Sequence, residues 1–295
     1  MADDWQEAIR TLGADHRSPS SALALRAAAL LDQLAKGSPA DLPAAGRALV
    51  RAQPAMASVV ATANVALRAL EALGAASVSA ALAALQRGVD ADRRAAARAV
   101  CDQLDAPIRV VTTSVSANVV AALEALRSAD LLQDVVCAES RPLLEGTALA
   151  RSLVDAGFDV TLVADAALPE HLRPGCVFLA GTDAILPDSI ANKCGTRVLA
   201  TWAKLCGVPR YVLATRDKIY PPELVAHWDN PEREPRELVQ DPPPKLRVEN
   251  RAFDRTPLSA WTTVWVGGLP LADALASGDR GAARALLEGR SGAGL

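Results

Sequence analysis

The chain has 295 residues, of which 51% are hydrophobic and only 3% aromatic, and its formal net charge is −3. This length allows one large domain or two ordinary domains, with cores built mainly from Ala, Leu and Val. A slightly acidic chain has no bulk attraction for nucleic acid or for an anionic membrane, so we expect neither as a partner. There is no run of about 18 apolar residues and no signal-like start, which favours a cytoplasmic protein.

The cysteine and histidine content gives no indication of a metal or redox centre. The five cysteines are odd in number, widely spaced and free of any CxxC motif, which predicts reduced thiols rather than a disulfide framework or a zinc site. The three histidines are isolated from one another, which favours loop or surface positions. We therefore expect no metal, and nothing in the sequence requires a nicotinamide, a flavin or another cofactor.

The first hundred residues have helical periodicity throughout. Apolar residues recur at helical spacing over residues 18–37, 43–50, 54–73, 78–87 and 90–105. Short loops between such segments are typical of antiparallel packing, so we predict a helical bundle domain over residues 1–105. The charges of Arg93, Arg94 and Arg98 favour an ordinary solvated helix face over a nucleic-acid site.

The period changes at residue 106. Short apolar runs at residues 108–113, 135–138, 159–163, 176–180, 211–214 and 262–266 alternate with helical segments. This alternation predicts an α/β fold: a helical N-terminal domain followed by a Rossmann-like, mostly parallel, doubly wound sheet domain over residues 106–295. We expect a helical tail over residues 269–288 and fraying of residues 291–295.

Polar segments follow four of these predicted strands, at residues 112–116, 139–141, 181–183 and 215–218. Since the carboxyl ends of parallel strands meet at one sheet edge, we expect a pocket there. The stretch 175–196 is the most informative, with a strand, the acid Asp183, a polar loop, and then Asn192 and Lys193 opening a predicted helix. Asp183 has two interpretations, a local cap of its turn or a ligand contact.

Residues 220–245 are rich in proline and charge, which is unlike a core segment or a long helix. We interpret them as an ordered excursion or a partner-facing arm. Trp228 within it would need an apolar partner, for which a second subunit is one candidate.

Several separated motifs occur in order along the chain: Arg51 with Pro54, residues 112–116, Glu139-Ser140-Arg141-Pro142 with Gly146, Gly181-Thr182-Asp183-Ala184-Ile185, Asn192-Lys193-Cys194-Gly195-Thr196, and Phe253-Asp254 with Thr256-Pro257. Together they resemble the family that joins the α, β and δ subunits of translation initiation factor 2B to methylthioribose-1-phosphate isomerase and ribose-1,5-bisphosphate isomerase. The resemblance covers about residues 51–257. It implies a helical domain on a Rossmann-like domain, usually paired into dimers, so we expect a homodimer.

The chain departs from the isomerases at the first strand tip. The position of their catalytic Cys is Ser114 here, and an unactivated hydroxyl does not supply the nucleophile that a thiolate does. Cys137 and Cys194 are alternative thiols, of which Cys137 is better explained by core packing, whereas Cys194 at a helix start remains open.

The resemblance and the strand tips together give the candidate site. Asp183 is the candidate catalytic, proton-shuttling group. The candidate ligand-binding residues are the cations Arg51, Arg141, Lys193 and Lys218 and the polar residues Ser114, Ser116 and Asn192.

Two functions follow from this site. In the first, the chain is an initiation factor 2B-like protein that binds a phosphorylated sugar or nucleotide and could act as an aldose-ketose isomerase on a pentose 1-phosphate. In the second, it is a non-catalytic regulatory or scaffold subunit related to the initiation factor subunits. The replacement of Cys by Ser114 leaves enzymatic activity open.

Overall fold

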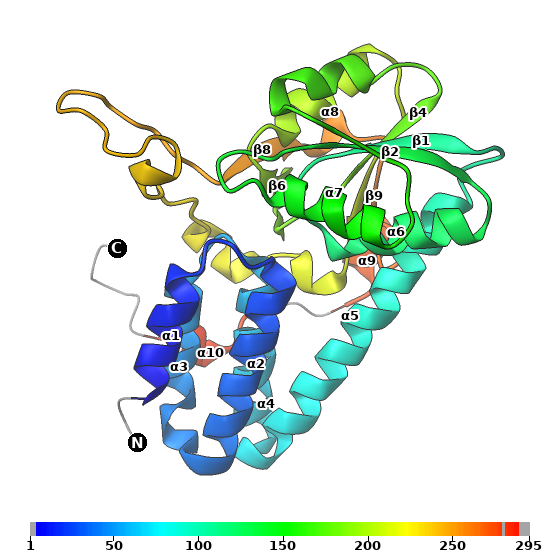
Figure 1. Cartoon of the computed structure of the whole chain (residues 1–295). Helices are drawn as coiled ribbons and strands as arrows, with labels where there is room; N and C mark the ends of the chain where they lie inside the picture. The colour runs from blue at the N-terminus through cyan, green and yellow to red at the C-terminus, as the bar shows by residue number, and fades with distance from the viewer. Residues whose placement is uncertain (1–3, 279–280, 289–295) are drawn as a thin grey trace.

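The computed structural model describes residues 4–278 and 281–288, and it places a bundle of helices against an α/β sheet (Figure 1). The bundle helices are α1 (Asp4–Ala14), α2 (Ser20–Gly37), α3 (Leu42–Ala52), α4 (Ala57–Leu73) and α5 (Val78–Cys101). Their apolar faces form one core, in which Leu23, Leu31, Leu49 and Leu67 are fully buried. Helix α1 begins before the first helix that the sequence indicated.

Helix α5 corrects the expectation of two helices over residues 78–87 and 90–105. It runs through the exposed Gly88, whose φ is not in the left-handed region, because a single glycine lowers helix propensity without ending a helix. Helix α5 therefore extends from the bundle to the sheet, where its last turns join the core under α6 (Ala117–Ser128). Because α5 packs on both parts of the chain, the division into domains at residue 105 stays a prediction.

The main sheet is doubly wound, as the sequence predicted. Its order is β10-β9-β7-β4-β1-β2-β3, and every neighbouring pair is parallel except β9 with β10. The strands are β1 (Ile108–Thr112), β2 (Leu132–Ala138), β3 (Val160–Val163), β4 (Cys176–Ala180), β7 (Arg210–Ala214), β9 (Thr263–Val266) and β10 (Leu269–Pro270). From β1 the chain first adds β2 and β3 on one side and then β4, β7 and β9 on the other, so the strand order reverses between β1 and β4. Ligands bind at such a reversal point in open α/β sheets.

Successive strand residues point to opposite faces of this sheet, and each face has its own helical cover. Val110 and Val177 pack with α5, α6 and α7 (Glu145–Asp155), whereas Val111 and Phe178 pack with the 3-10 helix η3 (Asp165–His171), α8 (Thr196–Leu205) and α9 (Leu271–Ala276). Because the strands are buried on both faces, their sequences are continuous apolar runs without polar alternation.

A second, antiparallel sheet corrects the expected polar loop and helix start between Asp183 and Thr196. It consists of β5 (Ala184–Ile185), β6 (Ser189–Lys193) and β8 (Phe253–Pro257). Asn192 and Lys193 end strand β6, paired with Asp254 and Phe253, and the helix begins only after Gly195 has taken a φ of 102°. The two side chains therefore point to opposite sides of a strand.

The segment after β7 projects from the body at residues 229–250, which we call the arm (Figure 1). Trp228 at its base packs on the bundle core, so its apolar partner is supplied by the chain itself. The expected helical tail is instead β10, α9 and the short α10 (Arg284–Leu287), which packs on α3 and α4. Residues 291–295 lie outside the described residues. The remaining 3-10 helices are η1 (Pro39–Asp41), η2 (Ala75–Ser77), η4 (Arg216–Lys218), η5 (Pro222–His227), η6 (Pro235–Glu237) and η7 (Leu258–Ala260).

Within residues 4–278 and 281–288, no helix combines the length and apolar character needed to cross a membrane.

Candidate functional site

Two adjoining cavities lie where the tips of β1 and β4 meet the loop between α1 and α2. The outer cavity has a volume of about 290 Å³ and the inner one about 40 Å³. Both are lined by Pro19, Ser20, Val115 and Asp183. The site therefore lies at the reversal point of the sheet, with one wall contributed by the helical bundle.

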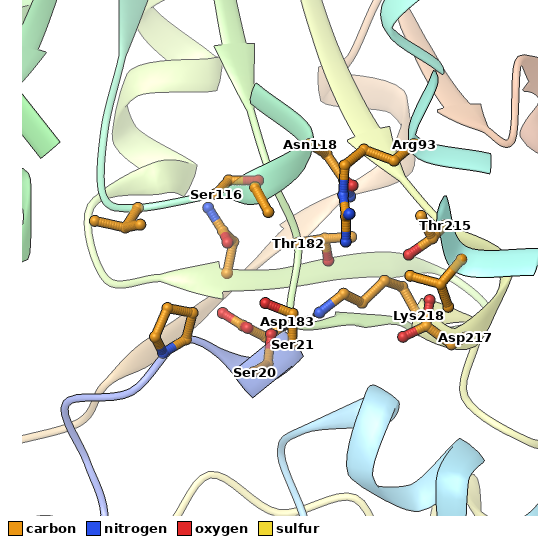
Figure 2. Close-up of a pocket in the computed structure, with 15 residues that line it drawn as sticks. Ser20, Ser21, Arg93, Ser116, Asn118, Thr182, Asp183, Thr215, Asp217 and Lys218 are labelled. Carbon is orange, nitrogen blue, oxygen red and sulfur yellow. Dashed lines mark hydrogen bonds between the residues drawn. The ribbon is translucent and has the colours of Figure 1, made fainter. Parts of the chain in front are cut away.

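Asp183 stands between the two cavities. Its backbone is fixed on both sides, because its N–H donates to the Ala191 carbonyl at 2.9 Å and its own carbonyl accepts from the Ala57 N–H at 2.9 Å. Its carboxylate has no hydrogen-bond partner in the described part of the chain, so the side chain does not cap its own turn. The carboxylate instead lines both cavities, where it can accept hydrogen bonds from a bound molecule (Figure 2).

Ser114, Glu145 and Lys193 form a polar cluster on the wall of the outer cavity. The Ser114 hydroxyl donates to Glu145 Oε1 at 3.2 Å, and Lys193 Nζ lies 2.6 Å from the same oxygen. The side chains of Lys193 and Glu145 are only 8% and 20% exposed. Glu145 Oε2 is buried without a partner among the described residues. The sequence did not single out Glu145, although Gly146 beside it was part of a motif.

Backbone geometry positions this cluster. Ser114 has a φ of 61°, and its N–H donates to Ser140 Oγ at 2.8 Å, which ties the β1 tip to the β2 tip. Helix α7 starts so close to β2 that a Cβ on Gly146 would lie 1.8 Å from the Ala138 carbonyl oxygen. Glycine at position 146 therefore allows the neighbouring Glu145 to reach the β1 tip.

Arg233 reaches the outer cavity from the arm. Its N–H donates to the Asn250 carbonyl at 2.7 Å, and Nη1 donates to the His16 carbonyl at 3.2 Å. The guanidinium carbon lies 5.7 Å from the ring centre of Phe253. Burial lowers the pKa of Arg233, against the opposing effect of the more distant Glu237, Asp183 and Glu145 charges. The sequence gave no signal for this residue, because it lies in a proline-rich segment without periodicity.

The inner cavity is lined from both the bundle and the sheet (Figure 2). Lys218 is 6% exposed and donates to Ser20 Oγ at 2.6 Å. Ser116 caps α6 by accepting from the Val119 N–H at 3.4 Å, and Asn192 Nδ2 donates to Thr196 Oγ1 at 3.1 Å.

Two side chains of the inner cavity each keep one polar atom without a partner in the described ranges, although Arg93 Nη1 pairs with Asp90 Oδ1 at 3.1 Å. Arg93 Nε and Asp217 Oδ1 are buried without a hydrogen bond in the described part of the chain. Arg93 was expected on a solvated helix face, but α5 instead directs it into this hollow (Figure 2). A guanidinium N–H and a carboxylate oxygen without partners are a donor and an acceptor available to a bound molecule.

The structure brings together six of the eight sequence-predicted site residues: Asp183, Ser114, Ser116, Asn192, Lys193 and Lys218. Arg51 lies apart, exposed on the outer side of α3, where it lines a separate cavity against α1. Arg141 is exposed and lines neither of the two cavities; its N–H donates to Asp165 Oδ2 at 2.7 Å. Neither arginine therefore contributes to the cavities around Asp183.

The alternative thiols are poorly placed for nucleophilic chemistry in the cavities. Cys137 is fully buried in β2, and burial raises its pKa to about 11, which agrees with core packing. Cys194 is exposed and lines neither cavity, and desolvation together with the nearby Asp254 raises its pKa. Within the described residues, no group of three His, Cys, Asp or Glu side chains is arranged to hold a metal ion.

The sequence matches a family model, the initiation factor 2 subunit family, over residues 16–265. A ribose 1,5-bisphosphate isomerase of Methanocaldococcus jannaschii is 34% identical over 127 residues, which are 42% of this chain and 41% of that protein. A methylthioribose-1-phosphate isomerase of Carboxydothermus hydrogenoformans is 39% identical over 137 residues, or 43% and 40% of the two chains. These alignments thus span less than half of each relative.

The fold has relatives among solved structures. The translation initiation factor eIF-2B of Pyrococcus horikoshii superimposes with a TM-score of 0.77 at 23% identity, covering 89% of this chain and 94% of the other. At this identity the likeness establishes the fold, which agrees with the helical and α/β parts described above.

Proposed function

Because the chain belongs to the initiation factor 2 subunit family, we propose that its two adjoining cavities bind a phosphorylated sugar or a nucleotide. The observation that carries the proposal is the position of Asp183, whose unpartnered carboxylate borders both cavities, with Lys193 lining one and Lys218 the other. Cations bind phosphate oxygens, and a carboxylate accepts hydrogen bonds from hydroxyl groups. A ligand that carries both kinds of group fits this set of side chains.

The size of the cavities supports a small ligand. The outer volume of about 290 Å³ is near the lower end of ordinary small-molecule pockets, and the inner cavity adds about 40 Å³. Ser114 and Ser116 supply hydroxyl groups to the two cavities. The names of two similar proteins, a ribose 1,5-bisphosphate isomerase and a methylthioribose-1-phosphate isomerase, support a pentose phosphate as the first candidate.

We further propose that the protein converts a bound aldose phosphate to a ketose phosphate. Converting an aldose phosphate to a ketose phosphate requires groups that give and take protons beside C1 and C2. Asp183 is the proposed proton carrier, and the Ser114 hydroxyl, held by Glu145, orients the sugar. The second candidate function is a non-catalytic binding subunit, and the specific observation in its favour is a serine in place of a thiol at position 114.

A ligand screen separates these functions. We expect a pentose 1-phosphate or a nucleotide to raise the Tm of the purified protein, because a ligand that binds only the folded state stabilises it. NMR of the same mixtures over hours distinguishes turnover from binding alone. We expect Asp183→Asn to abolish any turnover. The control is Asp188→Asn in the same hairpin, since Asp188 is exposed and pairs with Arg255 at 2.7 Å. If no phosphorylated compound changes the Tm, the binding function is wrong.

We also propose a cytoplasmic homodimer. Helix α8 exposes Val198, Trp202 and Leu205, which lie one turn apart along one side of the helix. Exposed apolar side chains gathered in this way are typical of protein interfaces. Sedimentation of the wild type and of Trp202→Glu tests the association, and a wild type that sediments as a monomer at all concentrations contradicts it.

A further inference from the structure

We propose that Arg233, supplied by the arm, is the principal anion-binding side chain of the outer cavity, an inference that rests on the ligand-binding function proposed above. Three Arg and Lys side chains line this cavity: Arg17, Lys193 and Arg233. Lys193 already faces Glu145 at 2.6 Å, and Arg17 is exposed to solvent. Only Arg233 combines partial burial with the absence of any carboxylate within 4 Å, as far as residues 4–278 and 281–288 show.

The protein supplies Arg233 with too few partners for its charge. Among the described residues its side chain makes one hydrogen bond, to the neutral His16 carbonyl, and it faces the Phe253 ring, although a guanidinium carries five N–H donors. Burial disfavours the charged form of this residue and so lowers its pKa. The charge of an anion in the cavity would offset that penalty, and its oxygens would accept hydrogen bonds from the remaining N–H groups. A planar guanidinium suits phosphate because it can bind two oxygens at once.

The backbone around Arg233 is built to hold it in place. The Arg233 N–H donates to the Asn250 carbonyl, while Asn250 Nδ2 donates to Glu237 Oε2 at 2.7 Å and to the Glu234 carbonyl at 3.0 Å. Glu237 Oε1 in turn lies 3.2 Å from His16 Nδ1 in the loop between α1 and α2. The base of the arm is thus fixed to the cavity wall, and Arg233 is presented from a constrained position.

Arg236 provides a matched control. It lies three residues further along the same arm, is exposed, and lines a different hollow formed by the arm itself. The change Arg236→Gln therefore removes the same charge from the same segment without touching the outer cavity.

The test measures binding of inorganic phosphate and of ribose 1-phosphate by calorimetry to the full chain. We expect Arg233→Gln to weaken binding of both by about tenfold or more, Arg233→Lys to fall between it and the wild type, and Arg236→Gln to bind like the wild type. Without ligand, the Tm of Arg233→Gln should not fall, because the change removes a charge for which the described part of the chain supplies no counter-ion.

Two results overturn the inference. One is wild-type affinity in Arg233→Gln. The other is a fall in the ligand-free Tm together with an equal loss of binding in Arg233→Lys, which a merely structural role would produce. A wild type that binds neither probe contradicts the proposed ligand-binding function itself, and the inference with it.

Discussion

The ion pair between Lys193 and Glu145 gives the sharpest test of how the site is held together. The change Lys193→Met removes the ammonium group that lies 2.6 Å from Glu145 Oε1 and leaves that carboxylate with the Ser114 hydroxyl alone. Breaking one side of a buried pair costs ~3–5 kcal/mol, because the remaining charge stays out of water without a counter-ion. Glu145 is 20% exposed beside a cavity, so we expect the lower end, about 3 kcal/mol.

Urea unfolding of the single and double variants measures this cost. The isosteric Glu145→Gln removes the stranded charge, so Lys193→Met combined with Glu145→Gln should recover at least half of the loss of the single lysine variant. Coupling of this kind is what a double-mutant cycle detects between residues in contact. If the losses of the two single variants simply add, or if Lys193→Met costs less than about 1 kcal/mol, the pair is not the buried unit described here.

Three further predictions concern backbone packing, an acidic side chain and the thiols. Gly146→Ala should destabilise the chain by ~1–3 kcal/mol, because the added Cβ would lie 1.8 Å from the Ala138 carbonyl oxygen. In the same chemical unfolding assay Gly88→Ala should stabilise the chain by ~0.5–1 kcal/mol, because there the added Cβ meets no described atom within 4 Å. Burial alone would raise the pKa of the Asp15 carboxyl, but hydrogen bonds from Ser18, Arg26 and Arg17 hold this pKa below its usual range. The stabilisation from the ionised carboxylate is therefore present above the ordinary Asp pKa of 3.8 and is lost as the pH falls below that value. Asp15→Asn should flatten the acid side of the stability profile and cost roughly 1–2 kcal/mol at neutral pH. A maleimide should label Cys194 well before Cys137 in native protein, because Cys137 is fully buried and burial raises its pKa to about 11. Mass spectrometry of the labelled peptides measures the order, and labelling of Cys137 first would contradict its position in the core.

Much of the fold could be predicted because the signals are local. The alternation of β-branched strands with helices fixes the doubly wound sheet, and each strand that is buried on both faces reads as one apolar run. The break expected near Gly88 was wrong because an exposed glycine lowers helix propensity without ending the helix. The helix start expected at Asn192 was wrong because these residues pair with Asp254 and Phe253, some sixty positions further along the chain.

The site residues that lie at the ends of strands could be predicted from the sequence. Those whose position depends on how distant segments pack together could not. Asp183, Ser114 and Lys193 come together because the tips of β1 and β4 and the end of β6 meet at one place. The exclusion of Arg51 depends on which side of α3 faces the core, which the spacing of Arg51 and Pro54 does not reveal. Glu145 gains its role only because α7 begins within hydrogen-bonding distance of the β1 tip.

Arg233 could not be found from the sequence at all. It lies fifty residues from Asp183, in a segment without periodic apolar residues, and reaches the cavity only because the arm folds back against the loop between α1 and α2. Long-range placement of this kind leaves no pattern in the residues around it.

The central claim is that a phosphorylated ligand binds in the cavities around Asp183. The most direct measurement is a crystal structure of the full chain soaked with ribose 1-phosphate. We expect density for the phosphate between Lys193 and Arg233 and for the sugar hydroxyls beside Asp183. Phosphate density only at Arg51 or Arg141, with the two cavities empty, would contradict the account.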